Sequence, residues 1–211
     1  AEVNAFTQWI REQNLNTFTD IELEKTAFTS AEKQFLEGNS NTAEKLLKEY
    51  LELYPQGTYG NPAQFYLAEI YFEKEDFAEA FPYYKSIVEQ QVSSYTEKSL
   101  VRIVSLLKKE ARLSEAIGYL EKLDQIASFQ ENKRFAKLNL MQAYFASNQF
   151  QKTLEVSSVV LEIKNLDTSL QWDATLLKAR SAVMLKDSLV AASAYEQLEQ
   201  VAQKEYAAEA L

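Results

Sequence analysis

Small residues recur about every 37 positions along this sequence, and this spacing limits the possible folds more than any other feature. The series is Ala43, Ala80, Ala116, Thr153 and Ala191, so the successive steps are 37, 36, 37 and 38 residues long. Apolar residues around each position recur at intervals of three and four, which is the pattern of an amphipathic helix. Periods of this length are typical of helical repeats that stack along a chain. The sequence therefore predicts a linear array of helix pairs.

The repeating pair is clearest at residues 61–92. Two apolar stripes of helical spacing are separated there by a polar break at residues 73–76, and Asp76 is placed to cap the second helix. Ala68 and Ala80 are small where two antiparallel helices would approach closely. Only 4 glycines and 3 prolines occur in 211 residues, which leaves little material for the turns of a sheet protein. We therefore expect an all-α fold.

The periodic region divides the chain into three parts. We expect an N-terminal arm or cap helix at residues 1–19, because the apolar residues between positions 3 and 10 have helical spacing. The repeat array follows at residues 20–204, and residues 205–211 have the pattern of the start of an incomplete further helix. The arm is interpreted either as the end or cap of a neighbouring unit, or as a segment that docks or pairs with another copy.

Residue types that carry most enzyme chemistry are missing. The chain has no cysteine and no histidine, which excludes disulfides, thiolate nucleophiles, imidazole bases and the common zinc ligand sets. The glycines are isolated, so no glycine-rich loop can cradle a phosphate. Carboxylates are dense between Glu69 and Glu79, but they alternate with apolar residues, as on a solvated helix face. We therefore predict a protein that is not an enzyme and that has no metal and no cofactor.

Charge and hydropathy argue against two further classes of partner. The net charge is −9, from 22 basic and 31 acidic residues, and no basic cluster interrupts it, so nucleic acid is not an expected partner. No apolar run reaches the roughly 20 residues that a membrane helix needs, so we expect no direct membrane insertion. The remaining candidate is a surface that binds a protein or a peptide.

Residues at fixed places in the unit resemble the tetratricopeptide repeat (TPR), which is about 34 residues long. Small residues fall at its eighth and twentieth positions, bulky apolar residues follow four positions after the twentieth, and a proline closes one unit: Ala31, Ala43, Leu47, Pro55, Ala68, Ala80, Tyr84, Ala116 and Leu120. The resemblance covers about residues 24–205. It implies an all-α right-handed α-α superhelix, or solenoid, of about five TPR-like helix pairs.

One segment narrows the resemblance further. The stretch from Phe35 to Phe77, with Tyr54 and Pro55 between two pairs, is similar to repeats in TPR proteins of the bacterial cell envelope. These are of the outer-membrane assembly lipoprotein and Tol-Pal-associated periplasmic types. The resemblance implies a location in the bacterial periplasm or at the outer membrane, with the cytoplasm as the alternative.

In the TPR fold the first helix of each unit lines a concave groove, so the resemblance also implies which residues face a partner. Carried over position by position, these residues are Phe28, Glu32, Phe35, Phe65, Glu69, Phe72, Lys108 and Phe145. An aromatic-lined groove suits a peptide or a helix of another protein. The implied function is a non-catalytic scaffold for protein–protein interaction. The alternative for each phenylalanine is packing between neighbouring units.

Two other functions stay open at this point. Exposed aromatic side chains could act as sugar platforms in a glycan-binding module of a bacterial envelope system, and Trp9 and Trp172 are the only tryptophans. The terminal segments could instead pair copies of the chain, which would make it a self-assembly scaffold and a homo-oligomer.

Overall fold

The computed structural model describes residue 9 and residues 20–209. Within these residues ten α-helices and one 3-10 helix follow one another, and no strand forms. Their bounds are α2 (Asp20–Leu36), α3 (Ser40–Leu53), α4 (Gly60–Glu73), α5 (Phe77–Glu89), α6 (Thr96–Lys109), η1 (Leu113–Ala116), α7 (Ile117–Ile126), α8 (Gln130–Ala146), α9 (Phe150–Leu161), α10 (Thr168–Met184) and α11 (Ser188–Glu209). The prediction of an all-α fold is confirmed. The arm predicted at residues 1–19 lies, apart from Trp9, outside the described residues.

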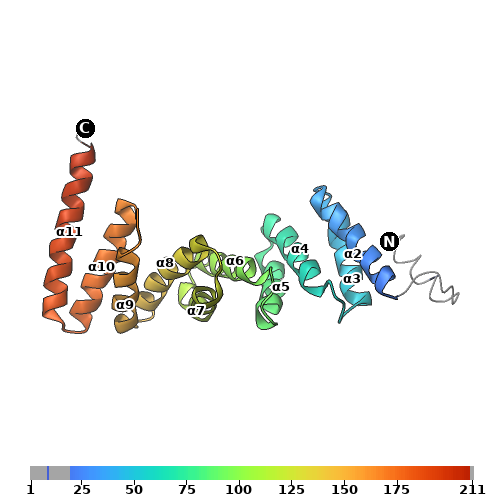
Figure 1. Cartoon of the computed structure of the whole chain (residues 1–211), viewed down its shortest axis with the longest axis horizontal. Helices are drawn as coiled ribbons and strands as arrows, with labels where there is room; N and C mark the ends of the chain where they lie inside the picture. The colour runs from blue at the N-terminus through green and yellow to red at the C-terminus, as the bar shows by residue number, and fades with distance from the viewer. Residues whose placement is uncertain (1–8, 10–19, 210–211) are drawn as a thin grey trace. The chain divides into compact units, whose positions relative to one another are not determined.

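Helices that follow one another in sequence pack on each other (Figure 1). In the N-terminal half α2 packs on α3, α3 on α4 and α4 on α5. In the C-terminal half α7 packs on α8, α8 on α9, α9 on α10 and α10 on α11. A first helix such as α4 or α8 therefore contacts the second helices on both sides of it. This is the packing of a TPR-like helical solenoid, and the described residues contain the ten α-helices that the predicted five helix pairs require.

The chain forms two compact units. The first unit ends at Ile103 and the second begins at Val104, so the boundary lies within α6. The spacing of the small residues crosses this boundary without a change, because Ala80 and Ala116 are separated by an ordinary step of 36 residues. Nothing in the repeat period marks the boundary, and the sequence pattern predicted one array.

The repeated small residues lie in the interior of each unit. The first four of the series, Ala43, Ala80, Ala116 and Thr153, are fully buried. Ala68 on α4 is fully buried as well. Small side chains let neighbouring helix backbones approach closely, and bulky side chains beside them fill the remaining space at crystal-like density. In the first unit the bulky residues include Tyr50 and Tyr84, which are both inaccessible to solvent.

The turn between the two helices of every pair has the same backbone conformation. One residue in each turn has a positive φ between 57° and 77°, namely Gly38, Glu75, Ala111, Asn148 and Lys186. These residues are separated by the same steps as the small residues. In each turn the next N–H bonds to the carbonyl five residues earlier, as Asp76 does to Tyr71 at 2.9 Å, which is the Schellman closure of a helix. Gly38 and Asn148 are of residue types that favour this conformation at a helix end, so a local sequence signal is present in two of the five turns.

The start of α5 and the end of α11 can each be compared with a prediction from the sequence. Asp76 caps α5 as predicted, since its side chain accepts a hydrogen bond from the Glu79 N–H. At the other end of the chain α11 continues without a break from Ser188 to Glu209. This differs from the prediction that a further helix starts at residue 205. The physical reason is that residues 198–209 contain no glycine, no proline and no Ser, Thr, Asp or Asn that could end one helix and cap another.

Among the described residues no helix has both the length and the apolar character that are required to cross a bilayer.

Candidate functional site

Two of the predicted binding residues, Phe28 and Phe65, are core residues instead. Their exposed fractions are 4% and 7%. The Phe28 ring stacks on Tyr59 with centroids 4.6 Å apart and an interplanar angle of 5°. The Phe65 ring packs against Tyr84 and Tyr95 at 6.1 and 5.1 Å. Their assignment to a binding surface is therefore corrected, and the alternative of packing holds for both, because a partner cannot reach them.

The other predicted residues of the first unit are partly exposed, and they begin with a cluster between α2 and α4. The Phe35 ring stacks on the Tyr66 ring, with centroids 4.6 Å apart and an interplanar angle of 22°. The Tyr66 hydroxyl donates a hydrogen bond of 2.8 Å to Glu32. All three side chains keep part of their surface in solvent. They form one aromatic and acidic contact surface that two successive first helices share.

A second cluster joins α4 to α6. Arg102 donates to both carboxylate oxygens of Glu69, from Nε at 2.8 Å and from Nη2 at 2.7 Å. The guanidinium lies over the Phe72 ring, 4.3 Å from its centroid. The buried Tyr84 hydroxyl also donates to Glu69. A bidentate ion pair stacked on an aromatic ring holds its geometry far better than a single exposed pair does.

The two clusters occupy equivalent places in successive helix pairs of the first unit. Glu32 and Glu69 are 37 residues apart, and each accepts a hydrogen bond from a residue 34 or 33 positions later. We call the set Glu32, Phe35, Tyr66, Glu69, Phe72 and Arg102 the first-helix strip. Sequence reasoning found four of its members and missed Tyr66 and Arg102. The sequence did contain a signal for both residues, because Tyr66 and Arg102 follow the predicted residues Glu32 and Glu69 by about one repeat.

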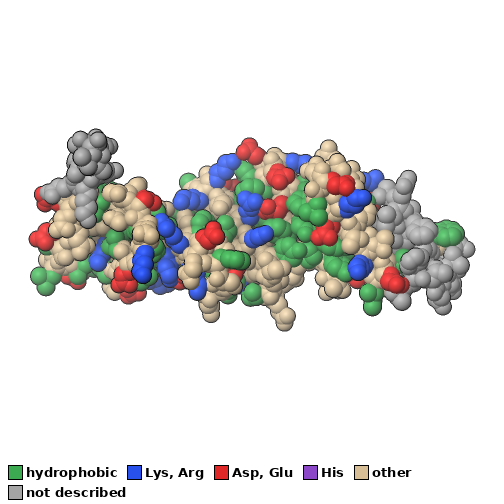
Figure 2. Space-filling model, turned by 45° about the horizontal axis from the view of Figure 1, so that its top comes forward, with side chains coloured by type: hydrophobic (Ala, Val, Ile, Leu, Met, Phe, Trp, Pro, Cys, Tyr) green, Lys and Arg blue, Asp and Glu red, His purple; other side chains and the backbone are tan. Residues whose placement is uncertain are grey.

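Figure 2 shows green apolar side chains gathered among red and blue charged ones over the part of the first unit that α2 to α5 form.

The polar groups of the first-helix strip mostly form hydrogen bonds with other groups of the protein. Burial raises the pKa of Tyr66, and its hydrogen bonds with Tyr95 and Glu32 raise that pKa further. The pKa of Arg102 is raised first by its bond to Glu69. The strip therefore keeps a neutral Tyr66 phenol and a charged Arg102 throughout the physiological pH range.

The two predicted residues of the second unit make separate local contacts. Lys108 donates a hydrogen bond of 3.0 Å to Asn139, and Asn139 is only 4% exposed. The Asn139 amide donates in turn to the Phe135 carbonyl. Phe145 is partly exposed and packs edge to face on Phe150 at 5.7 Å. Both residues therefore have a packing role within the second unit.

Another set of carboxylates connects second helices to the first helices that follow them. Glu44 on α3 accepts hydrogen bonds from Lys48, Lys74 and Tyr71 at 2.8, 2.7 and 3.0 Å. These bonds, the one from Lys48 first, lower the pKa of Glu44 to about 2. On α7, Glu121 accepts from Tyr144 of α8 at 2.6 Å, which lowers the pKa of Glu121. These carboxylates fix the packing between neighbouring pairs.

Further acidic residues lie at the end of α4, in the turn that follows it and at the start of α5. Glu73, Glu75, Asp76 and Glu79 are exposed, as expected of a solvated face. In the described part of the chain no three acidic residues are placed to hold a metal ion.

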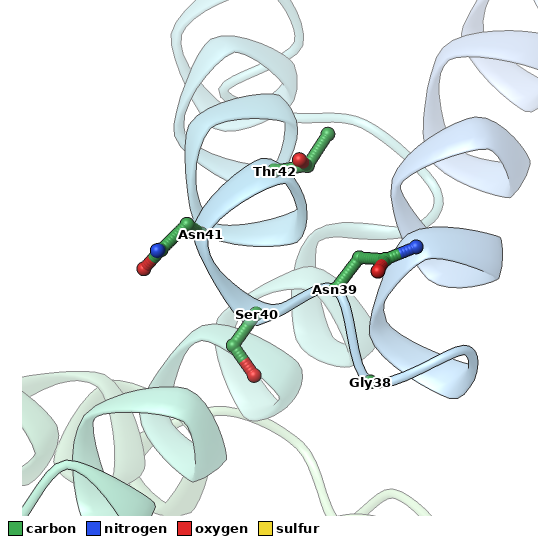
Figure 3. Close-up of a pocket in the computed structure, with 5 residues that line it drawn as sticks. All are labelled: Gly38, Asn39, Ser40, Asn41 and Thr42. Carbon is green, nitrogen blue, oxygen red and sulfur yellow. The ribbon is translucent and has the colours of Figure 1, made fainter.

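A small hollow lies at the turn between α2 and α3 (Figure 3). It is lined by Gly38, Asn39, Ser40, Asn41 and Thr42, which are the turn and the first residues of α3. The side chains of Ser40, Asn41 and Thr42 point in different directions in the close-up. The hollow lies at the start of α3 and includes no residue of the first-helix strip.

The side chains of both tryptophans are accessible in part. Trp9 is 49% exposed, and Trp172 on α10 is partly buried.

Comparisons with known proteins agree on the class of fold. A family model for the fifth ARM repeats domain of TT21 matches residues 61–158, and no curated protein matches the chain. YrrB, described as a TPR protein with an unusual peptide-binding site, has a TM-score of 0.58 at 16% identity over 94% of this chain and 93% of its own. MamA residues 41 to the end from Desulfovibrio magneticus RS-1 give 0.54 at 14% identity over 88% and 97%.

A third similar structure is the C-terminal part of a TPR repeat-containing protein from Cytophaga hutchinsonii. Its TM-score is 0.53 at 18% identity, over 97% of this chain and 76% of its own. At such identities the likeness concerns the fold alone. Together with the helix order and packing described above, it defines the chain as a TPR-like helical-repeat protein.

Proposed function

We propose that this protein is a non-catalytic scaffold that binds another protein on the first-helix strip of its first unit. The observation that carries the proposal is the repetition of one arrangement on successive first helices. On α2 and on α4, an aromatic ring and a carboxylate both contact one residue of the next first helix. That residue is Tyr66 on α4 in one case and Arg102 on α6 in the other. Such a surface is fixed before any partner arrives, so little side-chain entropy is lost on binding.

The chemistry of the strip suggests what the partner presents. Phe35, Tyr66 and Phe72 offer partly exposed ring faces and edges, which suit apolar side chains at regular spacing. Glu32 and Glu69 outnumber Arg102, so the strip has a small negative charge and favours a basic residue nearby. An extended peptide or one face of a helix, apolar with a basic flank, meets both requirements. The peptide-binding site described for YrrB supports this class of partner by analogy of fold only.

A peptide array tests the proposal. Short synthetic peptides with apolar residues at alternating or helical spacing, and with acidic, neutral or basic flanks, are probed with the purified chain. We expect binding to apolar peptides with basic flanks, and a Phe35→Ser variant should bind them about tenfold more weakly because a stacked ring is lost. Leu53→Ser is the matched control, since Leu53 is 38% exposed on the second helix α3.

Two outcomes would contradict the proposal. One is that no peptide binds the unaltered chain, and the other is that Leu53→Ser weakens binding as much as Phe35→Ser does. Unchanged helical circular dichroism and melting of both variants separate loss of binding from loss of structure. Tyr66→Phe gives a finer test, because it keeps the stacked ring and removes the hydroxyl with its hydrogen bonds to Glu32 and Tyr95.

The setting that we propose is the bacterial envelope, either the periplasm or the periplasmic side of the outer membrane. The support is the sequence similarity of the segment from Phe35 to Phe77 to TPR proteins of that compartment. Fractionation of the native cells followed by immunoblotting tests the location. Recovery with periplasmic or outer-membrane markers is expected, and recovery with cytoplasmic markers would contradict it.

A further inference from the structure

The first helices of the two units differ in charge. In the first unit, α2 carries four acidic and two basic residues, and α4 carries two acidic residues and no basic one. In the second unit the balance is reversed, because on α8 Lys133, Arg134 and Lys137 outnumber the single acidic residue Glu131. The helix α10 likewise has two basic residues and one acidic residue. The first helices of the two units therefore favour ligands of opposite charge.

The same reversal occurs at the places that form the first-helix strip. The place of Glu69 on α4 is taken two repeats later by Gln142 on α8. The place of Phe72 is taken one repeat later by Lys108, on the part of α6 that belongs to the second unit. Lys108 is exposed, and Gln142 is partly exposed. A neutral amide thus replaces a carboxylate, and a cation replaces an aromatic ring.

The cation is held in place by a buried neutral group. Lys108 donates a hydrogen bond of 3.0 Å to the Asn139 side chain, which is only 4% exposed. The Asn139 amide donates in turn to the Phe135 carbonyl at 2.8 Å, so the orientation of the asparagine is fixed. By contrast, Lys137 pairs with the carboxylate of Asp124 at 2.8 Å. Because the acceptor of Lys108 is an uncharged amide, the ammonium keeps its full charge, and the bond uses one of its three donors.

Polar and aromatic groups continue this surface along α8. Asn139, Gln142 and Phe145 follow one another at intervals of three residues, so they share one side of the helix. The Phe145 ring is partly exposed and is fixed by its edge-to-face contact with Phe150 at 5.7 Å. We call the set Lys108, Asn139, Gln142 and Phe145 the second-unit strip. It contains a cation, two amides and an aromatic ring, and it contains no carboxylate.

This combination of groups suits a peptide with acidic side chains. A carboxylate of the ligand can accept from Lys108 in a charge-assisted hydrogen bond. The amide of Gln142 offers both a donor and an acceptor, which match the N–H and C=O of an extended peptide backbone. Phe145 offers a ring face or edge to an apolar side chain. A nucleic-acid backbone suits the strip less well, since the strip has one cation and no arginine for its phosphates.

We propose that the second-unit strip binds an acidic segment of another protein. In this site a glutamate or aspartate side chain pairs with Lys108, the backbone of the segment pairs with Gln142, and an apolar side chain covers Phe145. The site lies wholly within the second unit. It is separate from the first-helix strip, which favours a basic flank, and it does not depend on the function proposed there.

Fluorescent synthetic peptides of equal length, capped at both ends, test the proposal. Each has one apolar residue flanked by glutamates, glutamines or lysines, and each is titrated with the whole chain and followed by anisotropy. We expect the glutamate peptide to bind most tightly and its affinity to fall as salt is added. Because the peptides are capped, a chain terminus cannot supply the carboxylate.

Two variants locate the site. Lys108→Gln can still donate to Asn139 but has no charge, so it should weaken binding of the glutamate peptide by at least about tenfold. Gln142→Glu should weaken the same peptide similarly, because it adds a like charge beside the ligand. Lys164→Gln is the matched control, since Lys164 is an exposed lysine in the loop between α9 and α10. Phe35→Ser, on the first-helix strip, should also leave this binding unchanged.

Four results would overturn the proposal. The first is no binding of the glutamate peptide at millimolar concentration of the chain, and the second is equal binding of the glutamate and lysine peptides. The third is an equal loss with Lys108→Gln and Lys164→Gln, since the attraction would then be spread over the surface. The fourth is a dimer in sedimentation velocity that Lys108→Gln abolishes, since the occupant would then be a second copy. Unchanged melting curves verify that the variants are folded.

Discussion

Tyr84 on α5 and Tyr195 on α11 are the same residue type at the same place in the repeat, but their environments are opposite. Tyr84 is fully buried between Phe65, Phe72 and the Glu69–Arg102 pair, and its hydroxyl donates to Glu69. Tyr195 is 45% exposed. The comparison teaches that a repeat pattern specifies a face that is able to pack, whereas burial of that face depends on the helix that comes next. A binding surface in such a protein is therefore a packing face without its neighbour.

The largest effect that we predict separates these two tyrosines. Tyr84→Ala should lower the free energy of unfolding of the first unit by about 3 to 5 kcal/mol, because it leaves a cavity and removes a hydrogen bond from a mostly buried carboxylate. Tyr195→Ala should cost less than about 1 kcal/mol, since the ring is half in water already. Urea denaturation followed by circular dichroism measures both. Equal losses would show that the two faces are packed alike.

The pairing of Glu44 on α3 with Lys48, Lys74 and Tyr71 should make the stability of the first unit depend on pH. Because the pKa of Glu44 is lowered to about 2 from an ordinary 4.5, its stabilisation is complete above pH 4.5 and is lost as the pH falls toward 2. Glu44→Gln should therefore cost about 1 kcal/mol at neutral pH, allowing for solvent screening, and should flatten the stability curve in that acid range.

Melting temperatures between pH 2.5 and 7 compare the unaltered chain with Glu44→Gln. A curve that Glu44→Gln leaves unchanged in the acid range would contradict the pairing of Glu44 with Lys48 and Lys74.

The five turns have the same backbone conformation but different residues at the positive-φ position, so they should contribute differently to the stability of the chain. Ala111 has φ at 57° and Gly38 has φ at 77°, and a side chain at positive φ costs roughly 1 kcal/mol. Ala111→Gly should raise the free energy of unfolding by about that amount, and Gly38→Ala should lower it similarly. Chemical denaturation of the two variants gives both values. If Ala111→Gly destabilises the chain, the turn conformation assigned to that pair is wrong.

The smallest effect concerns Ser157, which stands on α9 at the place of Tyr84 and Tyr195. It is fully buried, and its hydroxyl finds no hydrogen-bond partner. Ser157→Ala removes an unsatisfied polar group at little cost in volume, so it should stabilise the second unit by about 0.5 kcal/mol. A melting curve that shifts downward instead would show that the hydroxyl does have a partner.

The sequence was sufficient for the fold because two independent signals agreed. Helical spacing of apolar residues located the helices, and the small residues at a constant interval located their closest contacts. The turns were harder to predict, because Glu75, Ala111 and Lys186 have a positive φ that their residue types seldom adopt. The continuity of α11 was missed because the repeat period suggested a break where the local sequence contains no helix-ending residue.

The binding surface was only half predictable, for a physical reason. A first helix contacts second helices on two sides, so its apolar residues are divided among two packing faces and one exposed face. Spacing alone does not separate these faces, and Phe28 and Phe65 therefore appeared equivalent to Phe35 and Phe72. Tyr66 and Arg102 were missed because their importance lies in contacts between successive helix pairs. Tyr66 contacts Phe35 and Glu32, and Arg102 contacts Phe72 and Glu69.

The central claim is that partners meet the first helices of the first unit, and site-specific photocrosslinking tests it most directly. A photoreactive phenylalanine analogue is placed at Phe35 on α2 or, as the matched control, at Leu53 on α3, and the chain is irradiated in its native cells. The account predicts that one partner is captured from position 35 and not from position 53. Capture of the same partner from both positions, or from position 53 alone, would contradict it.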